Sequence, residues 1–461
     1  MVLNFPQNGI PNQADPELIN AWLEEGFQLH QAGQLDQAIA LYQRVLKADP
    51  KNVEALYLSG AVNVMRENYL EAVIQLSSAL KTDPDFAPAY GLLGEAQKNL
   101  GDYHSAAANY QRAITFEPEN FDLWNQYGNA LRLSGDIAGA QKAYAKKSAL
   151  KYRPGEQSVS DNPDFSFTSK TKLRHDIEQF QYLIEKNKID RRYQQTIDTY
   201  TDLLENFPIN PDDPYTSPIP ESFRAEFAPT YNRHVYFRDT PASSQSIINP
   251  SLDPAAIEAD YAKNEPGITY FDDFLKPDTL QAIREHCLES MVWHEFRYAN
   301  GYLGAFMNEG FFCPLLNQIV EALPKTLPGI FKDHQLINLW GYKYDSSMTG
   351  IDRHADEAAV NVNFWITPDD ANLDPNTGGL VIWNQEAPLD WDFEKFNADQ
   401  DAIKAFLEES GAQSIRVPHK QNRAVIFNSD LFHATDEIHF KNGYENRRIN
   451  ITLLYGRRHQ D

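Results

Sequence analysis

The segment that decides the fold of the C-terminal half begins Ile351-Asp-Arg-His354-Ala-Asp356 and continues as Ala359-Val-Asn-Val-Asn-Phe-Trp-Ile366. The second part is rich in β-branched and aromatic residues, which predicts a buried strand. The first part places a histidine and an aspartate two residues apart. Alternate residues of an extended chain point to the same side, so both side chains are expected on one face.

A third candidate metal ligand ends a later apolar run, Arg423-Ala-Val-Ile-Phe-Asn-Ser-Asp-Leu-Phe-His433. Two imidazoles and one carboxylate on one face of a metal ion leave further coordination positions open. A His-x-Asp pair alone occurs by chance in many long chains and is usually a solvated loop. The strand-like runs beside each member favour a metal site instead. We therefore predict that His354, Asp356 and His433 bind one metal ion.

The order of the neighbouring strand-like runs carries a family resemblance. The runs are Tyr342-Lys-Tyr344, Gly378-Gly-Leu-Val-Ile-Trp383 and Arg447-Arg-Ile-Asn-Ile-Thr-Leu-Leu-Tyr455. Together with the candidate metal ligands, they resemble the double-stranded β-helix (jelly roll) of 2-oxoglutarate- and Fe(II)-dependent oxygenases, in the subgroup that contains the prolyl hydroxylases. The resemblance implies that His354, Asp356 and His433 hold Fe(2+). It further implies that 2-oxoglutarate and O₂ are co-substrates and that an unactivated C–H bond is hydroxylated.

The resemblance also implies a basic residue that pairs with the far carboxylate of 2-oxoglutarate. Arg447 has the strand parity of the apolar residues Ile449, Ile451 and Leu453, whereas Arg448 has the parity of Asn450 and Thr452. A barrel that holds a charged co-substrate needs a polar interior patch, so Arg448 is expected to face inward. Its planar fork suits a carboxylate. Many relatives have serine where this chain has Asn450, and prolyl hydroxylases often use lysine where it has Arg448.

Two tyrosines compete for a second contact with the co-substrate. Tyr344 lies about where relatives place a tyrosine that bonds 2-oxoglutarate, and Tyr342 has the same parity. Plain barrel packing is the alternative for Tyr344. Three other histidines are interpreted as non-ligands: His439 in a turn-like stretch, His419 in a loop, and His175 in a capping or surface role.

The N-terminal half carries a repeat of 34 residues. Glycine, alanine, a large apolar residue and proline each recur with this period: Gly26, Gly60, Gly94 and Gly128; Ala38, Ala72, Ala106 and Ala140; Tyr42, Leu76, Tyr110 and Tyr144; and Pro50, Pro84 and Pro118. The small residues let two antiparallel helices approach, and the proline ends the second helix. The pattern is the signature of tetratricopeptide repeats, with four copies from about Ala21 to Tyr152, enough for a stable solenoid.

Composition limits the remaining possibilities. The chain has 461 residues and a formal net charge of −24, which argues against nucleic acid as a partner. The first residues do not resemble a secretory signal, and no apolar stretch of about 18 residues predicts a membrane span. Cys287 and Cys313 stand in apolar patterns and are expected to be reduced core residues. We therefore expect a cytoplasmic protein.

The predicted fold class is α+β multidomain. We expect tetratricopeptide repeats in residues 1–155, a helical cap and extended linker in 156–265, and an oxygenase domain in 266–461. Residues 172–186 and 190–206 are expected to be helices that cap the repeats, and 208–254 an extended coil. Within the oxygenase domain, an insert at residues 384–413 is either a wall of the site's mouth or surface decoration.

The sequence leaves the substrate open. Helical repeats of this kind usually bind peptides or protein segments, so we favour a peptide or protein substrate or partner. A small-molecule hydroxylase with recruiting repeats is a second interpretation. An interaction scaffold with an inactive barrel is a third, which the complete ligand set disfavours.

Overall fold

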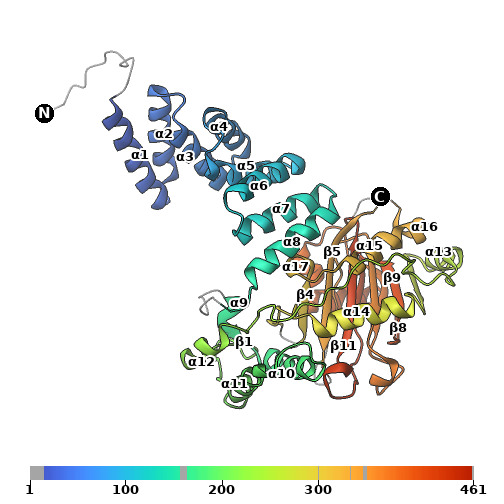
Figure 1. The fold of residues 1–461 in the computed structure, drawn as a ribbon. Coiled ribbons are helices and arrows are strands. Elements are labelled where there is room, and N and C mark those ends of the chain that lie inside the picture. Colours follow the sequence, from blue (N-terminus) through green and yellow to red (C-terminus); the bar gives the residue numbers. More distant parts are fainter. Residues whose placement is uncertain (1–14, 156–162, 299–300, 333, 346–349, 459–461) are drawn as a thin grey trace. The chain divides into compact units, whose positions relative to one another are not determined.

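The computed structural model describes residues 15–155, 163–298, 301–332, 334–345 and 350–458 (Figure 1). The chain divides into two compact units, residues 1–150 and residues 151–461. Residues 156–265, which we expected as a separate cap and linker, fall within the second unit.

The first unit consists of helices that follow the 34-residue period. Each repeat contributes two antiparallel helices, and Figure 1 shows them in order from blue to teal. The eight helices are α1 Pro16–Gln31, α2 Leu35–Ala48, α3 Val53–Met65, α4 Tyr69–Thr82, α5 Ala87–Asn99, α6 Tyr103–Phe116, α7 Phe121–Leu133 and α8 Ile137–Lys151. The prolines of the period lie just after α2, α4 and α6, where they cannot continue the helix.

The periodic glycines and the periodic large residues are packing partners. A Cβ atom at Gly60 would lie 2.6 Å from Cγ of Leu76, and one at Gly128 would lie 2.5 Å from the Tyr144 ring. Glycine is therefore required for the two helices of each repeat to approach. The periodic alanines are fully buried, as this close approach demands.

We expect Gly60→Ala to destabilise the repeats by about 1–3 kcal/mol, because the added methyl group overpacks the contact with Leu76. Gly91→Ala in α5 is the matched control. Its Cβ would lie 3.6 Å from Leu123, an ordinary contact, and alanine favours a helix over glycine by about 0.5–1 kcal/mol. Urea unfolding followed by far-ultraviolet circular dichroism measures both changes. Equal stability of the two variants would contradict the packing argument.

Residues 163–227 form a small helical region of the second unit. It contains α9 Pro163–Ser166, β1 Phe167–Thr168, α10 Lys170–Glu185, the 3-10 turn Arg191–Tyr193, α11 Gln194–Glu205, β2 Ser217–Pro218 and α12 Glu221–Phe227. The expectation of continuous coil over 208–254 was wrong, because β2 pairs with β1 and α12 follows it.

Helix α10 packs within the second unit against α14 (Pro277–Glu289), where the Gln179 side chain donates hydrogen bonds to Leu288 O at 3.1 Å and Ser290 O at 3.0 Å. The surface or capping role expected for His175 was also wrong. His175 is fully buried, its Nδ1 lies 2.9 Å from Asp176, and Ser169 caps the helix instead. Burial holds the pKa of His175 well below its usual value.

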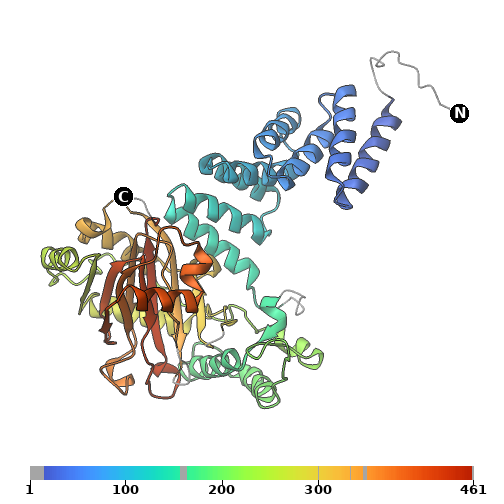
Figure 2. The same cartoon turned by 180° about the vertical axis from the view of Figure 1, so that it is seen from behind.

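Two antiparallel sheets form the rest of the second unit. The strands are β3 Ile268–Phe271, β4 Leu303–Phe306, β5 Leu336–Tyr344, β6 Val360–Trp365, β7 Leu380–Glu386, β8 Ser414–Val417, β9 Ala424–Asn428, β10 Leu431–Thr435 and β11 Arg448–Tyr455. The larger sheet has the order β3-β9-β6-β11-β5-β4, and the smaller has β10-β7-β8. Figure 2, which views the protein from behind, shows the strands of the larger sheet side by side.

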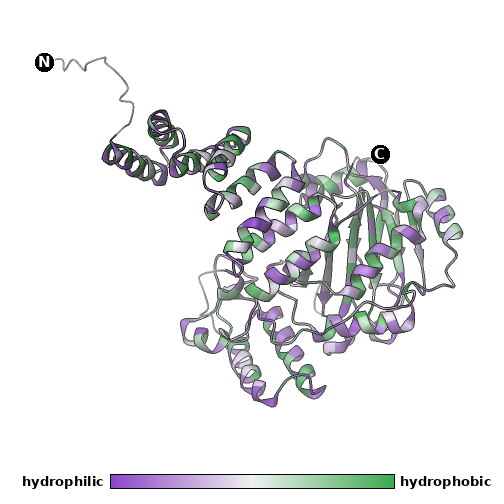
Figure 3. Ribbon diagram, turned by 45° about the horizontal axis from the view of Figure 1, so that its top comes forward, coloured by the Kyte–Doolittle hydropathy of each residue, from purple (hydrophilic) through white to green (hydrophobic). Residues whose placement is uncertain are grey.

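The inner faces of the two sheets share one apolar core. Trp365, Val425 and Phe427 of the larger sheet lie in the same buried cluster as Leu380, Ile382 and Leu431 of the smaller. Figure 3 shows strands of the second unit mainly in the green of hydrophobic residues, whereas the surrounding helices also carry purple residues.

Further helices surround the sheets: α13 Pro254–Lys263, α14, α15 Pro314–Thr326 and α16 Pro328–Phe331. Helices α14 and α15 each begin at a proline, a residue that favours the first turn of a helix. Cys287 and Cys313 are buried and free, and burial raises the pKa of both thiols to about 12. Across the described ranges, no helix combines the length and the apolar character needed to cross a membrane.

Candidate metal centre and its cavity

His354 and His433 are brought together by the backbone. The His354 N–H donates to His433 O at 3.0 Å, and the His433 N–H donates to His354 O at 2.8 Å, which forms an antiparallel bridge between the segment before β6 and strand β10. Asp356 follows two residues after His354. One ligand atom from each of the three side chains lies within 4.8 Å of the other two. The three residues predicted as ligands therefore converge.

Hydrogen bonds orient both rings for metal binding. His354 Nδ1 lies 2.8 Å from Asp352 O, and His433 Nδ1 lies 3.0 Å from Leu431 O. A carbonyl oxygen can only accept, so each Nδ1 carries the proton and each Nε2 keeps its lone pair. Both Nε2 atoms point toward the Asp356 carboxylate. His433 Nε2 lies 3.4 Å from Oδ2 of Asp356, and His354 Nε2 lies 3.9 Å from Oδ1. This tautomer presents two nitrogen donors to one point.

The protonation states also suit a cation. Burial, followed by the neighbouring His433, lowers the pKa of His354 to about 4, so the ring is neutral. Burial alone would raise the pKa of Asp356. The hydrogen bond and charge of His433, the charge of His354 and the hydrogen bond from Asn361 together lower it more, so the pKa of Asp356 lies below its usual value. A neutral His354 imidazole and an ionised Asp356 carboxylate result, and a divalent ion requires ligands in these states.

A chain of amide side chains supports the carboxylate. Asn361 Nδ2 donates to Asp356 Oδ2 at 2.7 Å, and Asn363 Nδ2 donates to Asn361 Oδ1 at 2.7 Å. Asn363 Oδ1 in turn accepts from Asn450 Nδ2 at 2.7 Å and from Thr452 Oγ1 at 2.8 Å. Asn450, which we expected near the co-substrate, is thus linked to Asp356, a candidate metal ligand, through Asn361 and Asn363 of β6. Sequence reasoning missed Asn361 and Asn363, although their alternation in Val-Asn-Val-Asn was a visible signal.

The ligand segment, residues 352–356, is bridged to β10 on one side and contacts the insert at residues 384–413 on the other. The insert contains α17 Phe393–Asn397 and α18 Gln400–Glu409. The Ala355 N–H donates to Phe396 O at 3.0 Å, Asn397 Nδ2 donates to Ala355 O at 3.1 Å, and Gln400 Nε2 donates to Arg353 O at 2.7 Å. His354 therefore lies between β10 and the insert. No pattern in the sequence pointed to Asn397 or Gln400.

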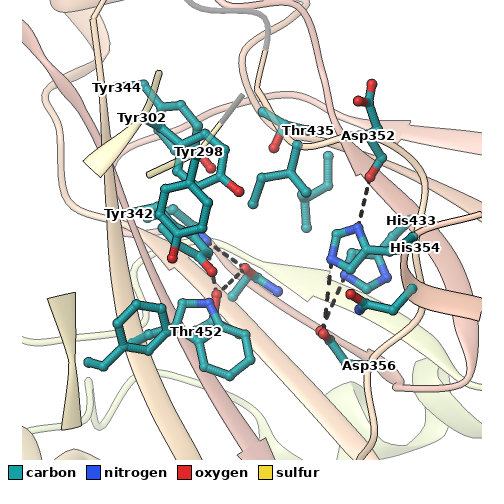
Figure 4. Close-up of a pocket in the computed structure, with 18 of the residues that line it drawn as sticks. Tyr298, Tyr302, Tyr342, Tyr344, Asp352, His354, Asp356, His433, Thr435 and Thr452 are labelled. Carbon is teal, nitrogen blue, oxygen red and sulfur yellow. Dashed lines mark hydrogen bonds and ion pairs between the residues drawn. The ribbon is translucent and has the colours of Figure 1, made fainter. Parts of the chain in front are cut away.

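The three candidate ligands lie on the wall of a cavity of about 490 Å³ (Figure 4). Tyr342 and Tyr344 both line it, and of the two it is Tyr344 that lies beside Arg448, opposite it in the ladder of β5 and β11. Asn450, Thr452 and Thr435 also line it, as do Phe393, Asn397, Ala398 and Gln400 of the insert. Of the two roles that the sequence left open for the insert, the wall of the mouth is the one found.

Arg447, just before β11, and Arg448, its first residue, point to opposite sides, as the strand parity predicted. Arg447 pairs with Glu178 of α10 at 2.7 Å. Arg448 points between the sheets, where Nε donates to Gly378 O at 2.6 Å and Nη2 donates to Gly379 O at 3.2 Å. Its guanidinium carbon lies 5.0 Å from the centre of the Tyr344 ring. Arg448 is buried and does not itself line the cavity, but its Nη1 has no hydrogen-bond partner.

Other buried polar atoms without partners lie close to Arg448. They are Trp365 Nε1, both ring nitrogens of His419 and Asp436 Oδ2. The His419 ring centre is 5.8 Å from that of Trp365 and 5.0 Å from that of Phe440. His419 is a loop residue, as expected, but it is buried, and burial together with the charge of Arg448 lowers its pKa to about 3. Buried polar atoms are seldom left unpaired, so this region is suited to a polar ligand. His439, by contrast, is exposed.

Comparisons with known proteins identify the first unit. Family models of the tetratricopeptide repeat match residues 29–96, 87–120 and 109–142. The N-terminal helices are therefore tetratricopeptide repeats, a class associated with protein–protein interaction. No curated protein matches the chain.

Several solved structures are similar to parts of the chain. Residues 41 to the end of MamA from Desulfovibrio magneticus RS-1 share 25% identity, with 29% of this chain and 75% of that chain covered and a TM-score of 0.28. The first tetratricopeptide domain of Spaghetti (RPAP3), bound to an HSP90 peptide, shares 22% identity over 28% of this chain and 99% of that chain, with a TM-score of 0.26. The tetratricopeptide domain of Arabidopsis OM64 shares 22% identity over 25% and 94%, with a TM-score of 0.24.

We expect Asn361→Ala to weaken divalent metal binding by about 10–100-fold, because residues that orient a ligand typically matter to this extent. Gln400→Ala is expected to weaken it as well, since the ligand segment loses the bond to Arg353 O. Calorimetric titration of the metal-free protein with Mn²⁺ measures both. Asn428→Ala, which removes an exposed bond to Glu386, is the control. Unchanged affinity in Asn361→Ala would exclude a supporting role for that amide.

Proposed function

We propose that the second unit is a double-stranded β-helix and that the protein is an Fe(II)- and 2-oxoglutarate-dependent dioxygenase that hydroxylates an unactivated C–H bond. The observation that carries the proposal is the convergence of His354 Nε2, His433 Nε2 and the Asp356 carboxylate at the wall of a cavity. Three donors on one side leave the cavity side of an ion open, as the facial arrangement of non-haem iron sites requires.

The course of the chain supports the proposed fold. After β5 in the larger sheet, the chain passes to the bridge at His354 beside β10, returns to β6, crosses to β7 and β8, returns to β9, crosses to β10 and ends in β11. Repeated passage between two antiparallel sheets with a shared core is the arrangement of a jelly roll.

The unpaired polar atoms around Arg448 fit a carboxylate. Nη1 of Arg448 and Nε1 of Trp365 are buried donors without partners. A charged donor bonds a carboxylate more strongly than a neutral one does. Tyr344, which lies under the guanidinium and lines the cavity, would separate this region from the metal ligands. We infer that the far carboxylate of 2-oxoglutarate binds here after a small shift of the surrounding side chains.

The residues of the chain would position the reactants. With iron(II) bound, the reaction class is oxidation of a C–H bond to an alcohol by O₂, balanced by conversion of 2-oxoglutarate to succinate and CO₂. His354, His433 and Asp356 would hold the ion, and Asn361 would fix the carboxylate ligand. The aromatic side chains of the cavity would keep water away from it.

We further propose that the substrate is a residue of a peptide or protein selected by the repeats. Four tetratricopeptide repeats supply a surface of the kind used for protein partners. A cavity of about 490 Å³ is of the size that takes small ligands, so only part of a peptide would enter it.

We expect the purified protein with Fe²⁺, ascorbate and 2-oxoglutarate to form succinate slowly, and faster when its substrate is present in a peptide library. His354→Ala is expected to abolish succinate formation, because one of three ligands is lost. His439→Ala removes an exposed imidazole and is the matched control. The proposed activity would be contradicted if the wild-type protein bound Fe²⁺ but formed no succinate with any peptide or small molecule.

We expect Arg448→Met, which keeps the volume but removes the charge, to raise the KM for 2-oxoglutarate by well over tenfold. Truncation of one partner of a buried charge pair costs about 2–5 kcal/mol. Metal affinity is expected to stay unchanged, because Arg448 does not contact the ligands. Arg447→Ala, a neutral change on sequence grounds, is unsuitable as control because it would leave Glu178 unpaired. Lys441→Ala on the surface serves instead. An unaltered KM in Arg448→Met would place the co-substrate elsewhere.

A further inference from the structure

The cavity has two chemically different ends along strand β5. Tyr344, Tyr342 and Trp340 are alternate residues of β5 that line the cavity. In the ladder with β11 they stand opposite Arg448, Asn450 and Thr452, respectively. Two residues of a strand span roughly 7 Å, so Trp340 lies about 13 Å along the strand from Tyr344. If the Arg448 end holds the co-substrate, the Trp340 end is left for the substrate.

The Trp340 end is walled by aromatic rings. Tyr298 and Tyr302 stack at 4.1 Å between ring centres, and Tyr342 stands edge-on to Tyr302 at 4.9 Å. Phe306 lies 6.3 Å from Trp340 and 6.2 Å from Tyr342. Figure 4 shows Tyr298, Tyr302 and Tyr342 on one side of the cavity and the candidate metal ligands on the other. The five rings come from β4, β5 and the segment before β4, so they form a wall of several elements.

The wall has a buried part, because Tyr302 packs with Tyr344 in one core cluster, and a part that borders the cavity. Tyr298, Phe306, Trp340 and Tyr342 are only half-buried, because they border the cavity. The face of an aromatic ring carries partial negative charge and attracts cations within about 6 Å of its centre.

Among the described residues that line the cavity, the permanently charged side chains are all negative. The described lining residues include the carboxylates of Asp352 and Asp356 and no lysine or arginine. In the proposed function Asp356 binds the metal ion. The carboxylate that remains is that of Asp352, at the start of the ligand segment. Asp352 is exposed and lies on the side of the candidate metal ligands, opposite the tyrosines (Figure 4), so it attracts a bound cation from across the cavity. The formal net charge of −24 adds a general attraction for cations.

We propose that the aromatic end of the cavity binds an organic cation, a guanidinium or alkylammonium group, and presents a neighbouring C–H bond to the metal side. The inference rests on the proposed function, which assigns the opposite end to 2-oxoglutarate. A neutral ring such as a prolyl side chain or a sugar would also stack on these residues. It would gain nothing from Asp352 or from the absence of basic groups. Guanidinium and alkylammonium groups occur both in peptide side chains and in free small molecules, and the chemistry of recognition is the same for both sources.

Pairs of ligands with equal shape and different charge test the proposal. Acetyl-arginine amide is compared with acetyl-citrulline amide, and choline with 3,3-dimethylbutan-1-ol. Calorimetric titration into the full chain without iron or 2-oxoglutarate measures binding alone. At least one cation is expected to bind at least tenfold more tightly than its neutral counterpart. The arginine pair represents a peptide side chain and the choline pair a free small molecule, so the tighter of the two cations indicates the source.

Variants of the wall separate ring faces from packing. Tyr342→Leu and Trp340→Leu are expected to weaken cation binding at least fivefold, whereas Tyr342→Phe, which keeps the ring, is expected to change it less than twofold. Asp352→Asn is expected to weaken the cation and leave the neutral counterpart unaffected. Tyr215→Leu, at an exposed tyrosine that does not line the cavity, controls for general effects.

Three results would overturn the proposal. They are equal affinity for charged and neutral partners, no binding of either cation at millimolar concentration, and equal effects of Tyr342→Leu and Tyr342→Phe. Selective cation binding without any formation of succinate would leave this inference in place and overturn the proposed dioxygenase activity alone. The two failures are therefore distinguishable.

Discussion

Two backbone hydrogen bonds tie the segment of His354 to strand β10 at His433, and the geometry of the site depends on them. They bring the two imidazole rings to 4.2 Å between centres. Carbonyl oxygens of Asp352 and Leu431 then turn each ring so that only Nε2 is free. Asp356 follows at the spacing of an extended chain and is fixed by Asn361. The positions of three donors are thus decided by main-chain pairing and by side chains that do not themselves reach the centre.

The features that the sequence predicted correctly are those in which the deciding contact is local or follows from a regular ladder. The repeats were predictable because Gly60 meets Leu76 and Gly128 meets Tyr144 at the same separation in every copy. The opposite placement of Arg447 and Arg448 followed from strand parity, which the pairing of β11 with β5 and β6 preserves. The convergence of the candidate ligands was predicted from the two-residue spacing of His354 and Asp356 and from the strand-like runs beside each ligand.

The features that sequence reasoning missed depend on contacts between distant segments. His175 is buried because α10 packs against α14 and because Lys343 of β5 reaches it at 3.2 Å, neither of which its own neighbours indicate. His419 is buried because the loop folds over Trp365 and Phe440. Asn397 and Gln400 support the ligand segment through amides that an exposed helix would equally carry. The sequence left Tyr342 and Tyr344 open because both have the same strand parity and face the same cavity, whereas the position of Tyr344 beside Arg448 depends on the pairing of β5 with β11.

The insert has two kinds of residues whose freedom to vary differs. Phe396, Asn397 and Gln400 hold the backbone around His354, and the Phe396 side chain is buried with Ile403 and Leu407. Phe393 and Ala398 line the cavity but are exposed. A change at the second pair would reshape the entrance while the anchoring residues keep the histidine and aspartate in register. The selectivity of the cavity for its ligands can therefore change during evolution, or be redesigned in the laboratory, while the positions of His354 and Asp356 stay the same.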